Sequence, residues 1–266
     1  LLLLLGTAGT AGAAPADFIL IRGMERYQCQ AIKDVAYIPD FYMSRHETTN
    51  QEVLELFNKA IAAGLIAIDG KSLHLKTASP GKTLLLYADG DAASLPWRLY
   101  LQDGKLAVNP LGRRHPCVNI TTQGGRLYCN LLSAQEGLKP FYKIVDRFLI
   151  DDYSNREPYG YRLPKNAWWE YAASGAGKGY QWVWGNVPIE KAGRVVGNFP
   201  DKSFKMKVAN YSTRAWVFNN YDDGYPWTAP VGSFPPNELG LYDMAGNVSE
   251  HMDDIIMVPV HNYRDS

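Results

Sequence analysis

The sequence is short of cysteine and of uncompensated charge, and each shortage excludes a class of protein. Its 266 residues include only three cysteines, Cys29, Cys117 and Cys129, with no Cys-x-x-Cys pair or histidine-cysteine cluster that would indicate zinc. The 27 basic residues balance the 27 acidic ones, so no net field attracts nucleic acid or an anionic membrane. The sequence also lacks internal repeats and any apolar stretch long enough for a transmembrane helix.

Aromatic residues, glycine and proline are by contrast plentiful. Seven tryptophans and 17 tyrosines occur with 24 glycines and 16 prolines, which predicts a loop-rich fold held together by aromatic side chains. The length allows one large domain or two small ones.

The chain opens with a run of five leucines followed by small residues. A leucine run leading into Ala14-Pro15-Ala16 is typical of the rear half of a secretory signal, with cleavage before Asp17. We therefore expect residues 1–16 to be the remnant of a signal peptide and residues 17–266 to be an exported domain, periplasmic, cell-surface or secreted. A flexible apolar terminus is the alternative. Export would permit disulfides, although an odd number of cysteines leaves at least one without a partner in this chain.

The first part of the domain shows clear element signals. Residues 34–43 predict a strand with a break at Pro39. Thr49 stands three residues before Glu52, which is the spacing of a capping box, and apolar residues at helical spacing follow. We expect this helix to end at Gly64.

Two further helices are expected, one over about 122–136 and one that begins around Pro164. Residues 71–111 are predicted to be an insertion containing short strands at 84–87, 97–101 and 105–108. Residues 177–230 show little periodicity, and a long irregular segment in a compact domain is usually functional or held by an ion.

One acidic loop is typical of a calcium site. In the stretch GLYDMAGNVSE at 240–250, Asp243 and Glu250 flank small residues whose carbonyls can turn inward. Ca²⁺ binds six to eight oxygens and combines carboxylates with main-chain carbonyls. The alternative is a plain turn, because Asp and Gly-Asn are also common turn formers.

Five motifs occur in one order and cover roughly residues 34–254. They are FYMSRHETTN at 41–50, PCVNIT at 116–121 leading to YCN at 128–130, YRLPKNAWWEYAA at 161–173, WGN at 184–186 and APVGSFPPNELGLYDMAGNV at 229–248. This series resembles the formylglycine-generating enzyme family, also called sulfatase-modifying factors. The resemblance implies an α+β fold, an irregular variant of the C-type lectin fold that is low in regular secondary structure.

The resemblance also implies two calcium sites, which carry over residue by residue. The first consists of the side chains of Asp243 and Glu250 and the carbonyls of Gly246 and Val248. The second consists of the side chains of Asn210 and Asp223 and the carbonyls of Tyr211 and Tyr225. Each set supplies four protein oxygens, and a bound ion would compensate for the missing ladder hydrogen bonds of an irregular chain.

Catalysis in this family uses two cysteines near the C-terminal end, which bind copper(I) and activate oxygen to oxidise a substrate cysteine. This sequence ends at Ser266, before the segment expected to carry that pair, so we assign no catalytic residue and expect copper only if the missing segment supplies the pair. The resemblance places the disulfide partner of Cys129 in the same segment. Cys29 and Cys117 are then a candidate pair.

Several positions depart from the family pattern. The chain reads GNVSEH where the family usually has GNVWEW, so Ser249 replaces a tryptophan that helps to shape the oxidase pocket and His251 replaces its neighbour. Thr122 stands where tryptophan is common and Lys165 where a capping threonine is usual. Loss of a large aromatic side chain would open a site that must exclude water.

The sequence therefore favours a calcium-stabilised domain that serves as a non-catalytic binding or scaffold module, with a protein or peptide as its partner. One alternative is a fragment of a copper-dependent oxidase that converts a sulfatase cysteine to formylglycine. Two closely spaced cysteines in the missing segment would favour it. Another is the accessory domain of an iron-dependent sulfoxide synthase, which would need a histidine-rich helical domain that this sequence lacks. Arg162 and Glu170, which also match the family, are predicted to form a structural ion pair.

Overall fold

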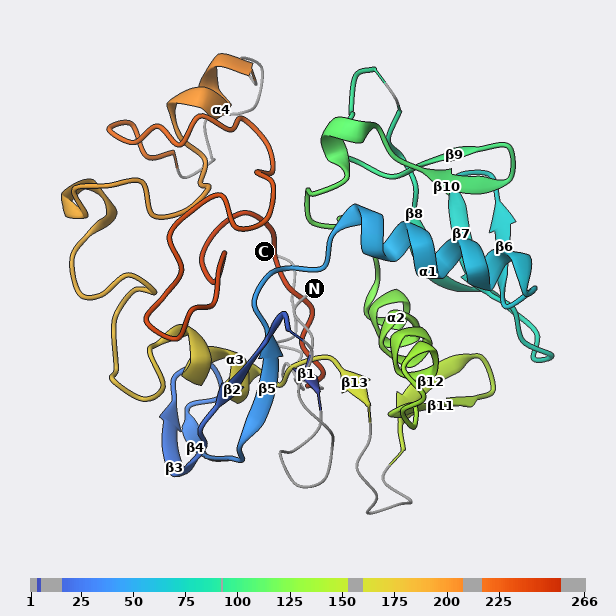
Figure 1. Ribbon diagram of the computed structural model, residues 1–266, viewed down its shortest axis with the longest axis horizontal. Helices are drawn as coiled ribbons and strands as arrows, with labels where there is room; N and C mark the ends of the chain where they lie inside the picture. Colours follow the sequence, from blue (N-terminus) through green and yellow to red (C-terminus); the bar gives the residue numbers. More distant parts are fainter. Residues whose placement is uncertain (1–3, 6–15, 92, 153–159, 208–216, 255–266) are drawn as a thin grey trace, which may run out of the picture.

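The computed structural model describes residues 4–5, 16–91, 93–152, 160–207 and 217–254. Within these ranges, short regular elements are joined by long irregular stretches (Figure 1), which confirms the predicted α+β fold. No described helix has the length and apolar character needed to cross a bilayer. The helices are α1 (Asn50–Ala62), α2 (Thr122–Gln135), α3 (Asn166–Ala173) and α4 (Lys202–Lys207), with 3-10 turns at Pro110–Gly112 and Ile189–Lys191.

All the described strands pair antiparallel in small sheets. A four-stranded sheet has the order β13 (Tyr161–Arg162), β1 (Leu4–Leu5), β5 (Phe41–Ser44) and β2 (Phe18–Ile21). Its strand β1 lies within the predicted signal remnant. The other sheets are β3 (Met24–Cys29) with β4 (Asp34–Ile38), β6 (Ile66–Asp69) with β7 (Ser72–Leu75) and β8 (Thr83–Tyr87), β9 (Tyr100–Gln102) with β10 (Lys105–Ala107), and β11 (Tyr142–Val145) with β12 (Phe148–Asp151).

The signals read from the first part of the sequence are confirmed. Thr49 accepts from the Glu52 amide, and Glu52 accepts from the Thr49 amide at 2.7 Å, which completes the capping box of α1. The break at Pro39 separates β4 from β5. Helix α2 covers the predicted range, and α3 begins at Asn166, two residues after Pro164.

Two hydrophobic clusters hold these elements together. One joins α1 and α2 to β6, β7 and β8, with Phe57, Leu73 and Leu85 fully buried. The other joins β3, β4 and β5 to α3 and includes Leu241 and Met244 of the acidic loop. Because both loop residues are almost fully buried, the second cluster fixes the backbone around Asp243.

The 71–111 segment packs against α1 through side-chain to backbone hydrogen bonds. Asn58 Nδ2 donates to the Leu106 carbonyl at 2.9 Å, and Asn58 Oδ1 accepts from the Leu106 amide at 2.8 Å. The buried Asn50 Nδ2 donates to the carbonyls of Trp97 and Gly112, at 2.8 and 2.9 Å. The loop that carries Trp97 is therefore fixed to the start of α1.

The candidate disulfide between Cys29 and Cys117 is wrong. All three cysteines are free and buried, and Cys29 and Cys117 belong to different hydrophobic clusters.

The predicted ion pair between Arg162 and Glu170 is also wrong. Arg162 instead lies 3.3 Å from Asp253 and 3.9 Å from Asp151. Glu170 accepts from the Tyr27 hydroxyl and from two backbone amides, those of residues 30 and 31. These donors offset the effect of burial, which alone would raise the pKa of Glu170, so that its pKa is lowered.

Candidate functional site

The four residues of the first predicted calcium set lie around one cavity. Asp243, Gly246, Val248 and Glu250 all line a space of about 390 Å³ beside α3. Asp243 has a left-handed backbone with φ of 55°, and its Oδ2 accepts from the Gly232 amide at 2.7 Å. Glu250 Oε2 accepts from the indole nitrogen of Trp169. Each carboxylate thus has one oxygen held by the protein.

The remaining carboxylate oxygens are buried without partners. Asp243 Oδ1, Glu250 Oε1 and Oε1 of the neighbouring Glu47 are enclosed and have no hydrogen bond. Burial raises the pKa of Asp243, and it raises the pKa of Glu250 to about 7. The pKa of Glu47 is raised well above its usual value, first by burial and then by the charge of Glu250. Buried polar atoms normally have partners, and a cation would supply one to these oxygens.

The donor set therefore fits a hard cation, with two side chains and two main-chain carbonyls from one loop. Among the described residues, no group of three or more histidine, cysteine or acidic side chains is arranged to hold a metal by itself. Calcium does not need such a group, because carbonyls and water complete its coordination. The four assignments stay a prediction.

Asn247 connects this loop to the rest of the molecule. Its Nδ2 donates to Glu47 Oε2 at 2.6 Å, and its Oδ1 accepts from the Ala229 amide at 2.8 Å. Gly246 packs so closely that a Cβ there would lie 2.1 Å from the Asn198 carbonyl oxygen. The carbonyls on either side of Asn247 are thus set by contacts with distant segments of the chain.

The second predicted calcium set is only partly described. Asn210 and Tyr211 lie outside the described residues. Asp223 accepts from the amides of Phe199 and Tyr225, both at 2.8 Å. Burial raises the pKa of Asp223 to about 6 against the lowering effect of these amides, and the adjacent Asp201 adds to the rise.

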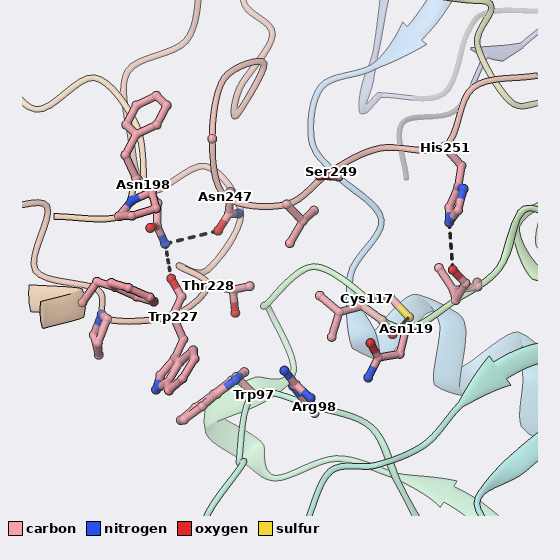
Figure 2. Close-up of a pocket in the computed structure, with 18 residues that line it drawn as sticks. Trp97, Arg98, Cys117, Asn119, Asn198, Trp227, Thr228, Asn247, Ser249 and His251 are labelled. Atoms are coloured by element: carbon pink, nitrogen blue, oxygen red, sulfur yellow. Dashed lines mark hydrogen bonds between the residues drawn. The ribbon is translucent and has the colours of Figure 1, made fainter. Parts of the chain in front are cut away.

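A larger space, which we call the aromatic cavity, also borders the acidic loop (Figure 2). It has a volume of about 660 Å³ and is lined by residues 97–98, 117–120, 198–200, 204, 226–228, 246–249 and 251. Gly246, Val248 and Ser249 line both this cavity and the one that holds the predicted calcium ligands. The acidic loop is therefore a shared wall.

Four parts of the chain line the aromatic cavity. Trp97 and Arg98 come from the 71–111 segment, Cys117 and Asn119 from the residues before α2, and Trp227 from the long irregular segment (Figure 2). Ser249 belongs to the acidic loop, and His251 directly follows it. The Trp97 and Trp227 rings are stacked with centroids 5.8 Å apart and planes at 20°.

Two of the departures from the family pattern form a hydrogen-bonded pair. His251 Nε2 lies 2.8 Å from the Ile120 carbonyl oxygen, and His251 Nδ1 lies 3.1 Å from Thr122 Oγ1. A carbonyl can only accept, so Nε2 carries the proton and Nδ1 accepts from the threonine hydroxyl. Ser249 is exposed at the cavity wall. The fourth departure, Lys165, gives α3 no side-chain cap, and Asp254 instead accepts from the Asn166 amide.

The cavity also contains residues that sequence reasoning missed. Arg98 Nη1 donates to Asp89 Oδ2 at 2.7 Å, and Asn119 Nδ2 donates to Asp89 Oδ1 at 2.8 Å. The adjacent Trp97 and Arg98 in the 71–111 segment were the one available signal. No motif or periodicity indicated which surface they would reach.

Comparison with known proteins gives the family. The sulfatase-modifying factor enzyme 1-like domain matches residues 8–260. Over 153 residues, the chain is 34% identical to the chaperone protein LppX of Paenibacillus barcinonensis, which covers 52% of this chain and 51% of LppX. Over 95 residues, it is 37% identical to the formylglycine-generating enzyme of Mus musculus, which covers 36% of this chain and 22% of that enzyme.

A solved structure shows the same fold. The crystal structure of CarF aligns with a TM-score of 0.55 and 24% identity, over 92% of this chain and 82% of CarF. The matches span about half of LppX and less than a quarter of the mouse enzyme, so the two proteins share only part of their length with this chain. The family match, by contrast, extends over nearly all of the sequence. The chain therefore belongs to the sulfatase-modifying factor enzyme 1-like domain family.

Proposed function

We propose that this chain is an exported, calcium-stabilised domain that binds a ligand in the aromatic cavity and does not itself oxidise it. The observation that carries the proposal is the cavity wall at residues 249–251. The resemblance expects two tryptophans there, and this chain has an exposed serine and a histidine that bonds to Thr122. Both side chains border a space of about 660 Å³, whereas a site that oxidises its substrate must exclude water.

Cys117 and Cys129 are not suited to bind copper or act as nucleophiles themselves. Cys117 lines the aromatic cavity but is only 3% exposed, and burial raises its pKa to about 12. Cys129 is completely buried, and burial raises its pKa as well. Soft metals are bound by thiolates, and a protonated buried thiol is a poor ligand and a poor nucleophile.

A calcium ion at Asp243 and Glu250 would stabilise the wall of the cavity. Residues 246–249 form that wall and contain the two carbonyls of the predicted ligand set. With the loop carbonyls fixed by the ion, the cavity would keep its shape before a ligand arrives, which lowers the ordering cost of binding. Similarity to the chaperone LppX supports a protein or peptide as the partner.

The alternative is a domain of a copper-dependent formylglycine-generating oxidase. Identity to the mouse enzyme favours it. In that case a cysteine pair outside this chain would hold the copper, and the aromatic cavity would receive the substrate peptide.

One experiment separates the two. The full-length protein that carries this chain is purified and mixed with calcium, copper(I), oxygen and a peptide that contains a sulfatase-type cysteine. Mass spectrometry then follows the peptide, and tryptophan fluorescence follows binding. We expect a calcium-dependent fluorescence change that Trp227→Ala removes, with the peptide cysteine intact. Formation of formylglycine in the peptide would refute the non-catalytic proposal. A calcium-independent signal, or one unchanged in Trp227→Ala, would refute the assignment of the cavity.

A further inference from the structure

We propose that Arg98 is the specificity-determining residue of the aromatic cavity and that it selects a ligand carrying a carboxylate. This inference rests on the proposed function, because it requires the cavity to be the ligand site.

Charge in the cavity has one source. Of the 18 lining residues, all within the described part of the chain, Arg98 alone has a formal charge, and none is aspartate, glutamate or lysine. The rest of the lining consists of aromatic, amide, hydroxyl and aliphatic groups together with the hydrogen-bonded His251. An anionic group on a ligand would therefore meet no like charge on the cavity wall, and a cationic group would find no partner there.

The guanidinium of Arg98 has unused hydrogen-bonding capacity. Asp89 is its one acceptor among the described residues, through Nη1, while Nε is buried without a partner. The side chain is 28% exposed and lies between Trp97 and Asn119 in Figure 2. A carboxylate accepts N–H groups from arginine, often two in parallel, and Nη2 of Arg98 has no acceptor among the described residues, whereas Nε is enclosed. A ligand carboxylate would thus give the guanidinium its second partner.

Because Asp89 pairs with Arg98, a ligand carboxylate would be recognised by direct hydrogen bonds and not by long-range attraction. Its carboxylate holds both Arg98 and Asn119, at 2.7 and 2.8 Å, and cancels the formal charge of the arginine. Long-range attraction of anions is therefore weak, and selection depends on donors in fixed positions. Asp89 is a positioning residue in this arrangement.

The backbone of the loop is built to keep Arg98 in place. A Cβ at Gly90 would lie 2.8 Å from Arg98 Cβ, and a Cβ at Gly112 would lie 2.0 Å from the Pro96 carbonyl oxygen. Asn50 adds a hydrogen bond to the Trp97 carbonyl. These close contacts tolerate only glycine and leave the loop little freedom to move. The 71–111 segment thereby supplies both an aromatic surface and a fixed cation to the cavity.

The ligand expected is an apolar or planar body that carries a carboxylate. The body would contact the indoles of Trp97 and Trp227 while the carboxylate meets Arg98. Two sources of this chemistry are the free C-terminus of a peptide and the acid group of a uronic acid.

The test measures binding of matched probes to the full chain by tryptophan fluorescence and calorimetry. One arm compares N-acetyl-Ala-Phe-Ala ending in a free carboxylate with the same peptide ending in a carboxamide. The other arm compares digalacturonic acid with its methyl ester. In at least one arm we expect the acid to bind at least tenfold more tightly than its neutral form. The arm that responds identifies the source of the carboxylate.

Variants assign the preference to a residue. Arg98→Gln should abolish the difference between acid and neutral probe, and Arg98→Lys should reduce it, because lysine retains the charge but not the planar fork. Arg113→Gln alters an exposed arginine outside the lining and should change nothing. Since Arg98→Gln leaves Asp89 unpaired, the double variant Asp89→Asn/Arg98→Gln provides a second form that contains no unpaired charge.

The outcomes are distinct. Equal binding of acid and neutral probes, or an acid preference that survives in both Arg98→Gln forms, overturns the role of Arg98 while leaving the cavity a ligand site. Absence of binding by every probe overturns this inference as well. The proposed function is refuted by a different result, namely that the sulfatase-type peptide of the preceding experiment gives no fluorescence response that depends on Trp227.

Discussion

Asp253 offers the sharpest test of how the acidic loop is anchored. Its side chain is fully buried, and its Oδ1 accepts from Arg126 Nε at 3.0 Å and Nη2 at 2.8 Å. Its Oδ2 accepts from the Tyr142 hydroxyl at 2.8 Å and from Arg162 Nη2 at 3.3 Å. One carboxylate therefore links the end of the acidic loop to α2, β11 and β13. We predict that Asp253→Asn severely destabilises the protein.

The magnitude follows from the burial of the partners. Arg126 and Arg162 are only 13% and 10% exposed, and their next acidic neighbour, Asp151, is 3.9 Å away from each. Removal of one charge from a buried pair costs about 3–5 kcal/mol, because the remaining charge stays desolvated. The side-chain amide nitrogen that Asp253→Asn introduces is itself a donor, and it would replace a carboxylate oxygen whose partners, the arginine N–H groups and the Tyr142 hydroxyl, are also donors. At about 2–4 °C per kcal/mol for a chain of this size, the melting temperature should fall by about 6–20 °C.

The assay is urea unfolding followed by circular dichroism, with Asp69→Asn as a matched control. Asp69 pairs with Lys82 at the surface, where both side chains are more than half exposed, and such pairs contribute about 0–1 kcal/mol. The control should unfold within about 1 kcal/mol of the natural chain. If Asp253→Asn does the same, Asp253 is not the buried link described here and the argument from buried charge is refuted.

Four further predictions concern the cavities. Asp243→Ala or Glu250→Ala should lower the melting temperature more in calcium than in chelator, and equal loss in both conditions would refute ligation. In chelator, the contribution of Glu250 to stability should decrease as pH rises from about 4.5 to 7, because the folded carboxyl, with its pKa of about 7, keeps its proton after the unfolded one has lost it; Glu250→Gln should remove that slope in unfolding measured against pH. Glu47→Gln should raise the melting temperature in chelator and weaken calcium binding in calorimetry, since it removes one of three neighbouring buried carboxylates; a lower melting temperature in chelator would contradict this. Thr122→Val should reduce the unfolding free energy by about 1 kcal/mol through loss of the bond to His251, and no change in urea unfolding would mean that the pair contributes nothing.

Local signals predicted the regular elements well. The capping box at Thr49, the break at Pro39 and the range of α2 each depend on residues close together in the sequence, and the structure contains all three. Gly124 is a poor helix former inside α2, and nothing in the sequence explains its presence there. A Cβ at that position would lie 2.1 Å from the Leu85 carbonyl oxygen, so glycine lets the helix approach β8. That contact joins residues 39 positions apart, and no local pattern reports it.

Long-range partners were the part that sequence reasoning could not supply. The pairing of Arg162 with Glu170 was inferred from two family positions, yet Arg162 bonds to Asp253, 91 residues away. The site residues divide in the same way. Asp243 and Glu250 stand in one short loop and could be predicted together, whereas Glu47 enters the same cluster through Asn247, 200 positions later. Arg98 was missed because its place in the aromatic cavity depends on how the 71–111 segment packs against the start of α1, which neither composition nor motif encodes.

Because the two cavities share part of their lining, binding in one is expected to affect binding in the other. Residues 246–249 line the aromatic cavity, and Gly246 and Val248, whose carbonyls belong to the predicted calcium set, also line the second cavity. Asn247 connects that wall to Glu47 and Ala229, so a shift of its two neighbouring residues would strain both hydrogen bonds. An ion that binds those carbonyls and a ligand in the aromatic cavity would therefore act on the same backbone. If the ion favours the wall conformation that the ligand contacts, thermodynamic linkage requires that the ligand favour the ion by the same factor. In this chain Ser249 and His251 stand where the resemblance expects tryptophans. A bound metal ion, in place of aromatic packing, would then keep the cavity in one shape.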